Sequence, residues 1–280
     1  MARSVAIVSD STSVDEEMAA RLGVVVVPLQ VVIGARSYAE GSATSPDDVA
    51  EALTRRQPVS TSRPAPQAFQ RVYEKAARAG AEAIVSIHLS GEVSGTCESA
   101  ELAARSCSVP VLVVDSRHLG MGAGFAVETA AAVLDAGGTA DEAADAARKR
   151  AAATTALFYV DTLEFLRRGG RVGAAAAIVG SALAVKPLLK VDDGRIVPLE
   201  KVRTSGRALA RLEALAVDAA GVADVDIAVS HLANADRAKE LAEHLRARVQ
   251  NCHTLVANQV GAVIGAHVGP GMLAVVVAPR

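Results

Sequence analysis

The first 160 residues alternate short, mostly apolar runs with segments of helical pattern, and this alternation restricts the possible folds more than any other feature of the chain. The strand-like runs include residues 5–8, 83–87 and 109–114, and the helical segments include 14–22, 94–105, 124–134 and 141–153. Runs without polar alternation are typical of strands that are buried on both faces. The pattern therefore predicts a parallel sheet with helices on both sides, which is an α/β fold.

The pattern changes near residue 160. Strand-like segments at 186–191 and 195–202 flank a turn at Asp192-Asp193-Gly194, and further strands are expected at 225–230, 252–256 and 272–277. Helices are expected between them at 205–219 and 236–249. We therefore divide the chain into an α/β/α domain at residues 1–160 and a mixed α/β domain at residues 161–280.

Composition narrows the class of partner. The 29 basic and 31 acidic residues give a net charge of -2, so the chain lacks the excess of positive charge that favours binding to nucleic acid or an anionic membrane. Four Phe, three Tyr and no Trp leave few side chains to stack on bases.

The three cysteines, at positions 97, 107 and 252, predict neither a disulfide framework nor a zinc site. The apolar run that follows Met1 is too short for a signal peptide or a membrane span. We expect a cytoplasmic protein without metal, cofactor or membrane span.

Two hydroxyl residues, Thr61 and Ser62, stand before Pro64 and a helix that begins at Pro66. Proline favours an extended backbone at the residue before it, so these hydroxyls can face an anion at a junction between loop and helix. The alternative is that they hydrogen-bond only to backbone groups ahead of the helix.

A second hydroxyl-rich segment, residues 89–96, follows the strand expected at 83–87 and opens a helix. Open α/β sheets bind ligands at this position, and the free N–H groups of a helix N-terminus favour an anion. Ser94, Gly95 and Thr96 suit one negative charge, although an ordinary helix N-cap remains the alternative. The G-x-x-x-x-G-K-[ST] pattern is absent, so a nucleotide-binding loop is not indicated.

His267 lies in an apolar, Gly-rich segment, residues 261–271, which we interpret as a turn. Its glycines let the backbone approach a ligand closely, and a ring N–H can complete a carboxylate site. A structural histidine is the alternative. A basic group at Arg167, Arg168 and Arg171 either faces an acidic partner or a phosphate, or forms a solvated surface.

Taken in order, several short motifs of this chain resemble those of the DegV family. They are residues 8–12, Thr61-Ser62-x-Pro64, residues 93–96, Gly169-Gly170-Arg171, Lys186-Pro187-Leu188, residues 201–204 and residues 267–271. The resemblance implies two domains with a lipid site at their interface. It implies a three-layer α/β/α domain on a parallel sheet, followed by a two-layer domain with a mixed six-stranded sheet.

The resemblance also implies a function, that of the fatty-acid-binding subunit of bacterial fatty acid kinase. Such a subunit binds a long-chain fatty acid and presents its carboxylate to a separate ATP-dependent kinase subunit, which forms an acyl phosphate. The chain is then not itself an enzyme. A lipid-sensing regulatory protein would share these motifs. The substrate-binding subunit of a dihydroxyacetone-kinase-like enzyme is a further alternative, but it needs a histidine placed for covalent attachment, which the sequence does not identify.

By the same resemblance, the carboxylate is held by Thr61, Ser94 and His267, with Ser62 and Gly95 beside them. Arg203 resembles the arginine that docks the kinase subunit. Residues 178–185, Leu188 and Ile264 are candidates to line the acyl tunnel. Glu40 stands where the family frequently has Asp.

Overall fold

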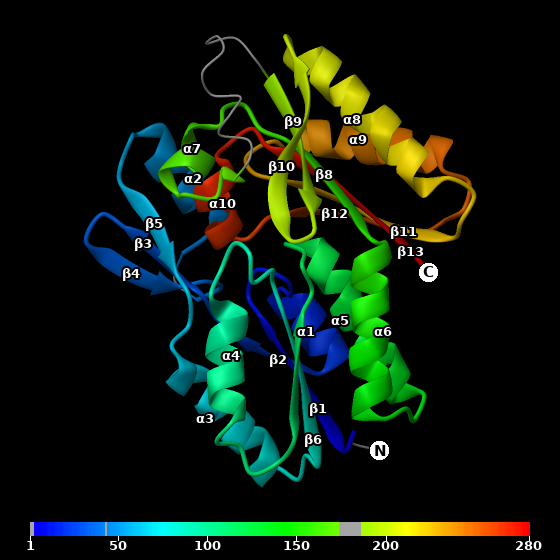
Figure 1. The fold of residues 1–280 in the computed structure, drawn as a ribbon. Coiled ribbons are helices and arrows are strands. Elements are labelled where there is room, and N and C mark those ends of the chain that lie inside the picture. The colour runs from blue at the N-terminus through cyan, green and yellow to red at the C-terminus, as the bar shows by residue number, and fades with distance from the viewer. Residues whose placement is uncertain (1–2, 43, 174–185) are drawn as a thin grey trace.

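A four-stranded parallel sheet organises the N-terminal part of the chain (Figure 1). The computed structural model describes residues 3–42, 44–173 and 186–280. In the order β2-β1-β6-β7, the strands are Val24–Val27, Val5–Asp10, Ala83–His88 and Val111–Asp115. Adjacent side chains of a strand point to opposite faces, and Ile7 and Val8 are both fully buried, so both faces of this sheet are covered.

Helices lie on both faces of this sheet. One face carries α3 (Pro66–Arg78) and α4 (Thr96–Ala104), and the other carries α1 (Glu16–Leu22), α5 (Met121–Asp135) and α6 (Ala140–Ala153). Val8 packs with Phe69 and Tyr73 of α3, whereas Ile7 packs with small alanine side chains of α5 and α6. The three-layer α/β/α arrangement predicted from the alternation is confirmed.

A small antiparallel sheet stands apart from the first one. In the order β4-β3-β5, its strands are Arg36–Ala39, Gln30–Ile33 and Val59–Ser62. Helix α2 (Pro46–Thr54) lies between β4 and β5 in the sequence. Strand β4 was not predicted from the sequence; it pairs with β3, with Tyr38 opposite Val31. One sequence interpretation was wrong here. Thr61 and Ser62 lie on β5 and not in a loop. Both strands are edge strands with little burial, so their hydrophobic alternation is weak.

A mixed six-stranded sheet forms the C-terminal part, as expected. Its order is β10-β9-β8-β13-β11-β12, with bounds Arg195–Val202, Lys186–Asp192, Thr155–Tyr159, Leu273–Pro279, Val225–His231 and Cys252–Gln259. Since β8 already belongs to this sheet, the chain passes from one sheet to the other after α6, a few residues before position 160.

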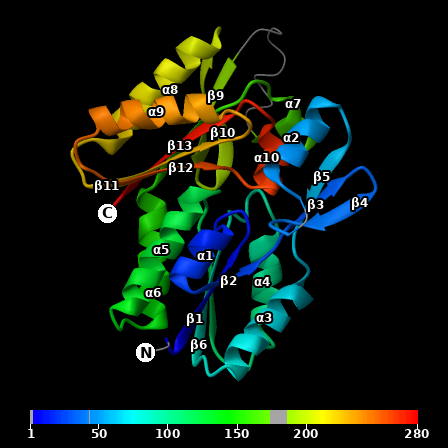
Figure 2. The ribbon, with the colours of Figure 1, turned by 180° about the vertical axis from the view of Figure 1, so that it is seen from behind.

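The two faces of the six-stranded sheet have different covers (Figure 2). Helices α8 (Ser205–Ala220) and α9 (Ala235–Arg248) pack on one face, and Leu188 is buried beneath them. The opposite face meets the N-terminal part, where Phe125 of α5 packs on Ala228 and Val276. Leu188 therefore points away from the junction between the two parts and does not line a tunnel there.

The interpretation of residues 261–271 as a turn was also wrong, because Ala262–Val268 form helix α10. This helix lies beside α2 and α7 (Glu164–Arg168), at the top left of the molecule in Figure 1. Its seven residues include a glycine and three β-branched residues, which lowers its intrinsic helix propensity. Burial of Ala262, Val263 and Ala266 against Leu29 and neighbouring apolar residues stabilises it instead.

A buried ion pair joins the two parts on the opposite side of the molecule. Arg150 of α6 and Asp226 of β11 are 9% and 4% exposed and form a hydrogen-bonded pair. Arg150 also donates to the carbonyl oxygen of Pro279, and the Arg280 Nε donates to Asp226 at 3.1 Å. None of the helices among the described residues is long and apolar enough to cross a membrane.

Replacing Asp226 by Ala is expected to lower the free energy of unfolding by about 3–5 kcal/mol, because it leaves the Arg150 guanidinium buried and unpaired. Denaturant unfolding measures the change. The double variant Arg150→Met with Asp226→Ala should recover part of the loss, since neither charge then remains buried. Asp145→Ala, which removes an exposed partner of Arg148, is the control and should change the stability little. Equal losses in the single and double variants would contradict this account.

Candidate functional site

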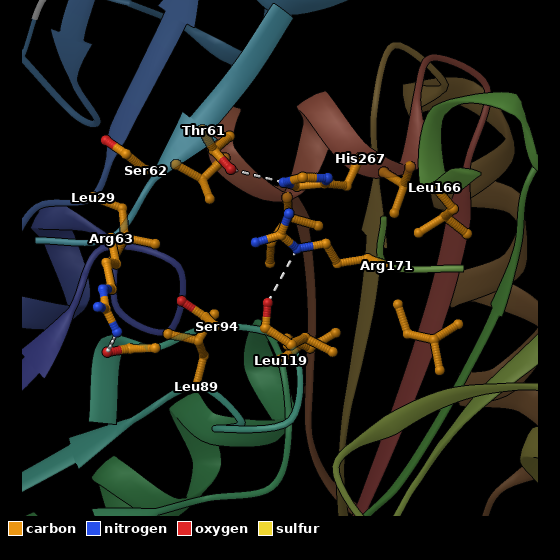
Figure 3. A pocket seen from close by; sticks show the side chains of 16 residues that line it. Leu29, Thr61, Ser62, Arg63, Leu89, Ser94, Leu119, Leu166, Arg171 and His267 are labelled. Carbon is orange, nitrogen blue, oxygen red and sulfur yellow. Dashed lines mark hydrogen bonds between the residues drawn. The ribbon is translucent and has the colours of Figure 1, made fainter. Parts of the chain in front are cut away.

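A cavity of about 290 Å3 lies where β5, the loop before α4 and helix α10 meet (Figure 3). It is thus lined by residues from both halves of the sequence. All of the residues predicted for carboxylate binding line it, namely Thr61, Ser62, Ser94, Gly95 and His267. The tertiary structure therefore brings three separate sequence motifs together in one place.

The Thr61 hydroxyl and the His267 imidazole form a hydrogen bond across this cavity. Their atoms Oγ1 and Nε2 are 2.8 Å apart, although the residues are separated by 206 positions in sequence. On β5, Val59 and Thr61 turn to the partly buried side while Ser60 and Ser62 are exposed. Strand alternation therefore selects Thr61, and not its neighbours, to meet the imidazole of α10.

Burial controls the charge of His267. Burial, together with the smaller effect of the positive charge of Arg171, lowers the pKa of the imidazole to about 4. The ring is therefore neutral near pH 7, with one nitrogen protonated. Nε2 is bonded to Thr61, whereas Nδ1 is buried and has no hydrogen-bond partner in the part of the chain that the structure describes.

Gly169 makes room for this ring. A Cβ atom at position 169 would lie 2.1 Å from Nδ1 of His267, a distance that no side chain tolerates. Gly169 follows α7 directly as its C-cap residue. The contact with the His267 ring therefore explains why position 169 of the Gly169-Gly170-Arg171 motif is glycine.

Ser94 does not act as an ordinary N-cap. Helix α4 is capped by Gly95 without a side-chain hydrogen bond, and Ser94 Oγ lies 2.8 Å from Thr96 Oγ1 instead. The Arg63 guanidinium crosses Gly95, where a Cβ would lie 1.9 Å from Nη1. Arg63 donates to the Gly95 carbonyl oxygen at 3.2 Å and pairs with Glu98. Gly95 is therefore needed for this close approach of Arg63.

Arg171 is a wall residue of the cavity that the sequence interpretation did not place there. Its Nε donates to the Val93 carbonyl oxygen at 3.1 Å, a bond dashed in Figure 3. Its Nη1 donates to the Gly169 carbonyl oxygen at 2.5 Å. Arg167 and Arg168 instead pair with Glu164 on the exposed side of α7. The Gly169-Gly170-Arg171 motif separates Arg171 from these neighbours in the sequence, but it does not indicate the contacts that place Arg171 at the cavity.

An apolar cavity of about 60 Å3 continues from the first one. The two share Leu119, Ile196, Ile264 and Val268, and the second is lined further by residues such as Met121 and Phe158. Ile264 was predicted to line a tunnel, and it does line both cavities. The other predicted lining segment, residues 178–185, lies outside the described residues. The remaining apolar wall residues come from several elements far apart in sequence, among them α5, β8 and β13, so no single sequence segment marks this wall.

Arg203 lies elsewhere. It is exposed in the turn between β10 and α8 and is not part of the cavity wall. The cavity itself combines the hydroxyls of Thr61, Ser62 and Ser94, a neutral imidazole and two guanidinium groups, those of Arg63 and Arg171, with an apolar continuation. That arrangement suits an amphiphilic ligand with a small anionic head. Within residues 3–42, 44–173 and 186–280, no three His, Cys, Asp or Glu side chains are grouped to hold a metal ion.

Comparisons with known proteins agree on one family. The family model described as "Uncharacterised protein, DegV family" matches residues 4–280. The chain is 56% identical over 281 residues to a DegV domain-containing protein of Streptomyces coelicolor, and the match covers 100% of both chains.

Two solved structures are similar over 100% of both chains. One is a DegV family protein from Thermus thermophilus, described by its fatty acid binding, with a TM-score of 0.94 and 30% identity. The other is DegV from Bacillus subtilis, described as a fatty acid binding protein, with a TM-score of 0.91 and 31% identity.

Replacing Gly169 by Ala is expected to displace the His267 ring and to break its hydrogen bond with Thr61, because the added methyl group occupies the position of Nδ1. The side-chain nitrogen resonances of His267, measured by NMR, should shift. Gly206→Ala is the control, since a Cβ there meets nothing within 4 Å. An unchanged His267 spectrum in Gly169→Ala would show that the described ring position is wrong.

Proposed function

The chain belongs to the DegV family, and on that premise we propose that it binds a long-chain fatty acid in the cavity beside Thr61, Ser94 and His267. One observation carries the proposal. Polar donors from both halves of the sequence converge at one end of a cavity whose continuation is apolar. The solved relatives from Thermus thermophilus and Bacillus subtilis, described as binding fatty acids, support the same ligand class.

The head group fits the hydrogen-bonding state of His267. If Nε2 carries the ring proton, it donates to Thr61 Oγ1, and the Thr61 hydroxyl is free to donate to a carboxylate oxygen. Nδ1 is then an unprotonated acceptor, which is less costly to leave unpartnered than a buried N–H. Ser94 donates to the carboxylate from the opposite wall, with Ser62 and Gly95 beside it.

Charge also favours a carboxylate at this position. Arg171 is held by two carbonyl oxygens, which are neutral, and no carboxylate is paired with it by these contacts. Its positive charge therefore acts on the cavity and attracts an anionic head. A small uncharged ketone of the dihydroxyacetone type has no use for the apolar continuation, which makes that alternative less favourable.

The acyl tail would extend from the head-group cavity into the apolar cavity, which at about 60 Å3 must widen to hold a long chain. Burial contributes roughly 0.8 kcal/mol per methylene group, so a long chain has ample driving force to enter it. The unbranched side chain of Met121 lines this cavity and can change conformation to enlarge it. Residues 1–160 and 161–280, taken as the two domains of the proposal, would then enclose the ligand between them.

We further propose that the chain is a cytoplasmic, non-catalytic subunit that presents the carboxylate to a separate ATP-dependent kinase subunit, which forms the acyl phosphate. The absence of a phosphate-binding loop from the sequence supports a division of labour of this kind. Arg203, exposed and outside the cavity, would take part in docking the kinase subunit.

Ser94→Ala and His267→Ala are each expected to lower retention of hexadecanoic acid at least tenfold. Ser94→Ala removes a hydrogen bond to the charged head group (about 1.5–3 kcal/mol), and His267→Ala removes the N–H donor that turns the Thr61 hydroxyl toward the carboxylate. Lipid extraction and mass spectrometry of the purified variants measure retention, and thermal unfolding checks the fold. Ser106→Ala, at the far end of α4, is the control. Retention at the wild-type level in both site variants would rule out this site.

Arg203→Ala is expected to retain fatty acid normally but to slow acyl phosphate formation in the presence of a kinase subunit and ATP. Its side chain lies outside the cavity, so the loss would arise from docking. The exposed Arg207, two residues into α8, provides the control variant Arg207→Ala. If the wild-type protein carries fatty acid but supports no acyl phosphate formation, a lipid-sensing role replaces the carrier role.

A further inference from the structure

Glu40 links the two parts of the chain beside the cavity, through a carboxylate that is buried in their junction. The residue follows β4 directly and is 8% exposed. Its Oε2 accepts a hydrogen bond from Ser11 Oγ at 2.6 Å, and its Oε1 accepts one from the backbone N–H of Val263 at 2.7 Å. We call these two hydrogen bonds the Glu40 latch.

Helix α10 provides both a hydrogen-bond donor and the space for the Glu40 carboxylate. Helix α10 begins at Gly261 without a side-chain cap, so the Val263 N–H is one of the free donors of its first turn. A Cβ at position 261 would lie 2.4 Å from Glu40 Oε1, so only glycine admits the carboxylate here. Glu40 therefore caps this helix from a distant part of the sequence.

The latch also reaches the cavity at two points. Val263 lines the cavity, and His267 lies one helical turn after it on α10. On the other side, Ser11 Oγ accepts a hydrogen bond from the backbone N–H of Leu29 at 3.0 Å, and Leu29 lines the cavity as well. A displacement of the Glu40 carboxylate would therefore move the cavity wall formed by α10 and the wall that contains Leu29.

We infer that Glu40 is a positioning residue for the ligand site, which holds the first turn of α10 against the end of β1 and thereby fixes His267 opposite Thr61. This inference rests on the proposed function for its ligand. Glu40 does not touch the ligand itself, because its oxygens are occupied by Ser11 and Val263.

The charge of Glu40 makes the latch sensitive to pH. Burial, with a smaller contribution from the negative charge of Asp10, raises the pKa of its carboxyl from an ordinary value of 4.5 to about 7, against the opposing effect of its two hydrogen bonds. Burial therefore favours the protonated carboxyl in the latched arrangement, where it still accepts from the Val263 N–H and donates its own proton to Ser11 Oγ. This preference is complete below pH 4.5 and is lost as the pH rises through 7, so the equilibrium shifts by about tenfold between pH 6 and pH 8.

The other titratable groups around Glu40 come from the elements packed against it. Asp10 ends β1 and is held ionised by His88, Thr12 and the Leu89 N–H, which lower its pKa against burial. Asp15 and Glu16 of α1 line the same crevice as Glu40, and Asp47 stands at the start of α2. On α10, the pKa of His267 lies at about 4, so this ring stays neutral between pH 6 and pH 8.

Release of hexadecanoic acid to phosphatidylcholine vesicles, measured at pH 6 and pH 8, tests the latch. Glu40→Gln keeps an acceptor for the Val263 N–H and a donor toward Ser11 but has no charge to titrate. The ratio of the wild-type release rate to that of Glu40→Gln should therefore rise by up to about tenfold from pH 6 to pH 8. Glu40→Ala should release faster than Glu40→Gln at both pH values.

Asp47→Asn is the matched control, because Asp47 also bridges the two parts, by accepting from Gln259 Nε2 at 2.7 Å, but neither residue lines the cavity. It should keep the wild-type dependence on pH. A wild-type to Glu40→Gln ratio that is the same at both pH values would overturn the inference, whether or not Glu40→Ala folds.

Failure of the inference can be distinguished from failure of the proposed function. A wild-type protein that takes up no hexadecanoic acid at either pH contradicts the proposed function alone. The side-chain NMR signals of His267 then test the latch without a ligand. They should shift in Glu40→Ala and be restored in Glu40→Gln, and unshifted signals in Glu40→Ala would refute the positioning role.

Discussion

The hydrogen bond between Thr61 and His267 joins the two halves of the chain at the ligand cavity, and it forms only when strand, helix and junction are all in place. It needs a strand that turns Thr61 to the cavity, a short helix that carries His267, and a packed junction that holds the two 2.8 Å apart. It also needs Gly169, since any side chain there would occupy the place of the imidazole. The site is therefore a product of the junction and belongs to neither half of the chain alone.

The electrostatics of this junction follow from the cost of burying charge. His267 is kept neutral by burial, and the guanidinium of Arg171 is bound by backbone carbonyl oxygens at the cavity wall. These neutral donors, with Arg171 beside them and Arg63 already paired with Glu98, attract a carboxylate without a buried carboxylate of the protein competing for the same donors. The carboxylates of Asp10 and Glu40 are instead held by their own hydrogen bonds behind the cavity.

The sequence predicted regular elements better than irregular ones. Buried strands such as β1 and β6 and long helices such as α6 carry their pattern locally, because burial on fixed faces imposes a period. Strand β4 and helix α10 were missed for opposite reasons. The edge strand β4 buries too little to show alternation, whereas α10 is too short and too apolar on all sides to show a helical period. Arg171 and Leu29 entered the site only through contacts between distant segments.

The sequence by itself determined the α/β alternation, the change of pattern near residue 160 and the motifs that contain Thr61, Ser94 and His267. These features depend on local periodicity and residue type, which are visible along the chain. Only the tertiary structure decided that the three side chains share one cavity, that Leu188 faces away from it and that Glu40 reaches the first turn of α10. Such proximities arise from the packing of elements far apart in sequence, and no local pattern encodes them.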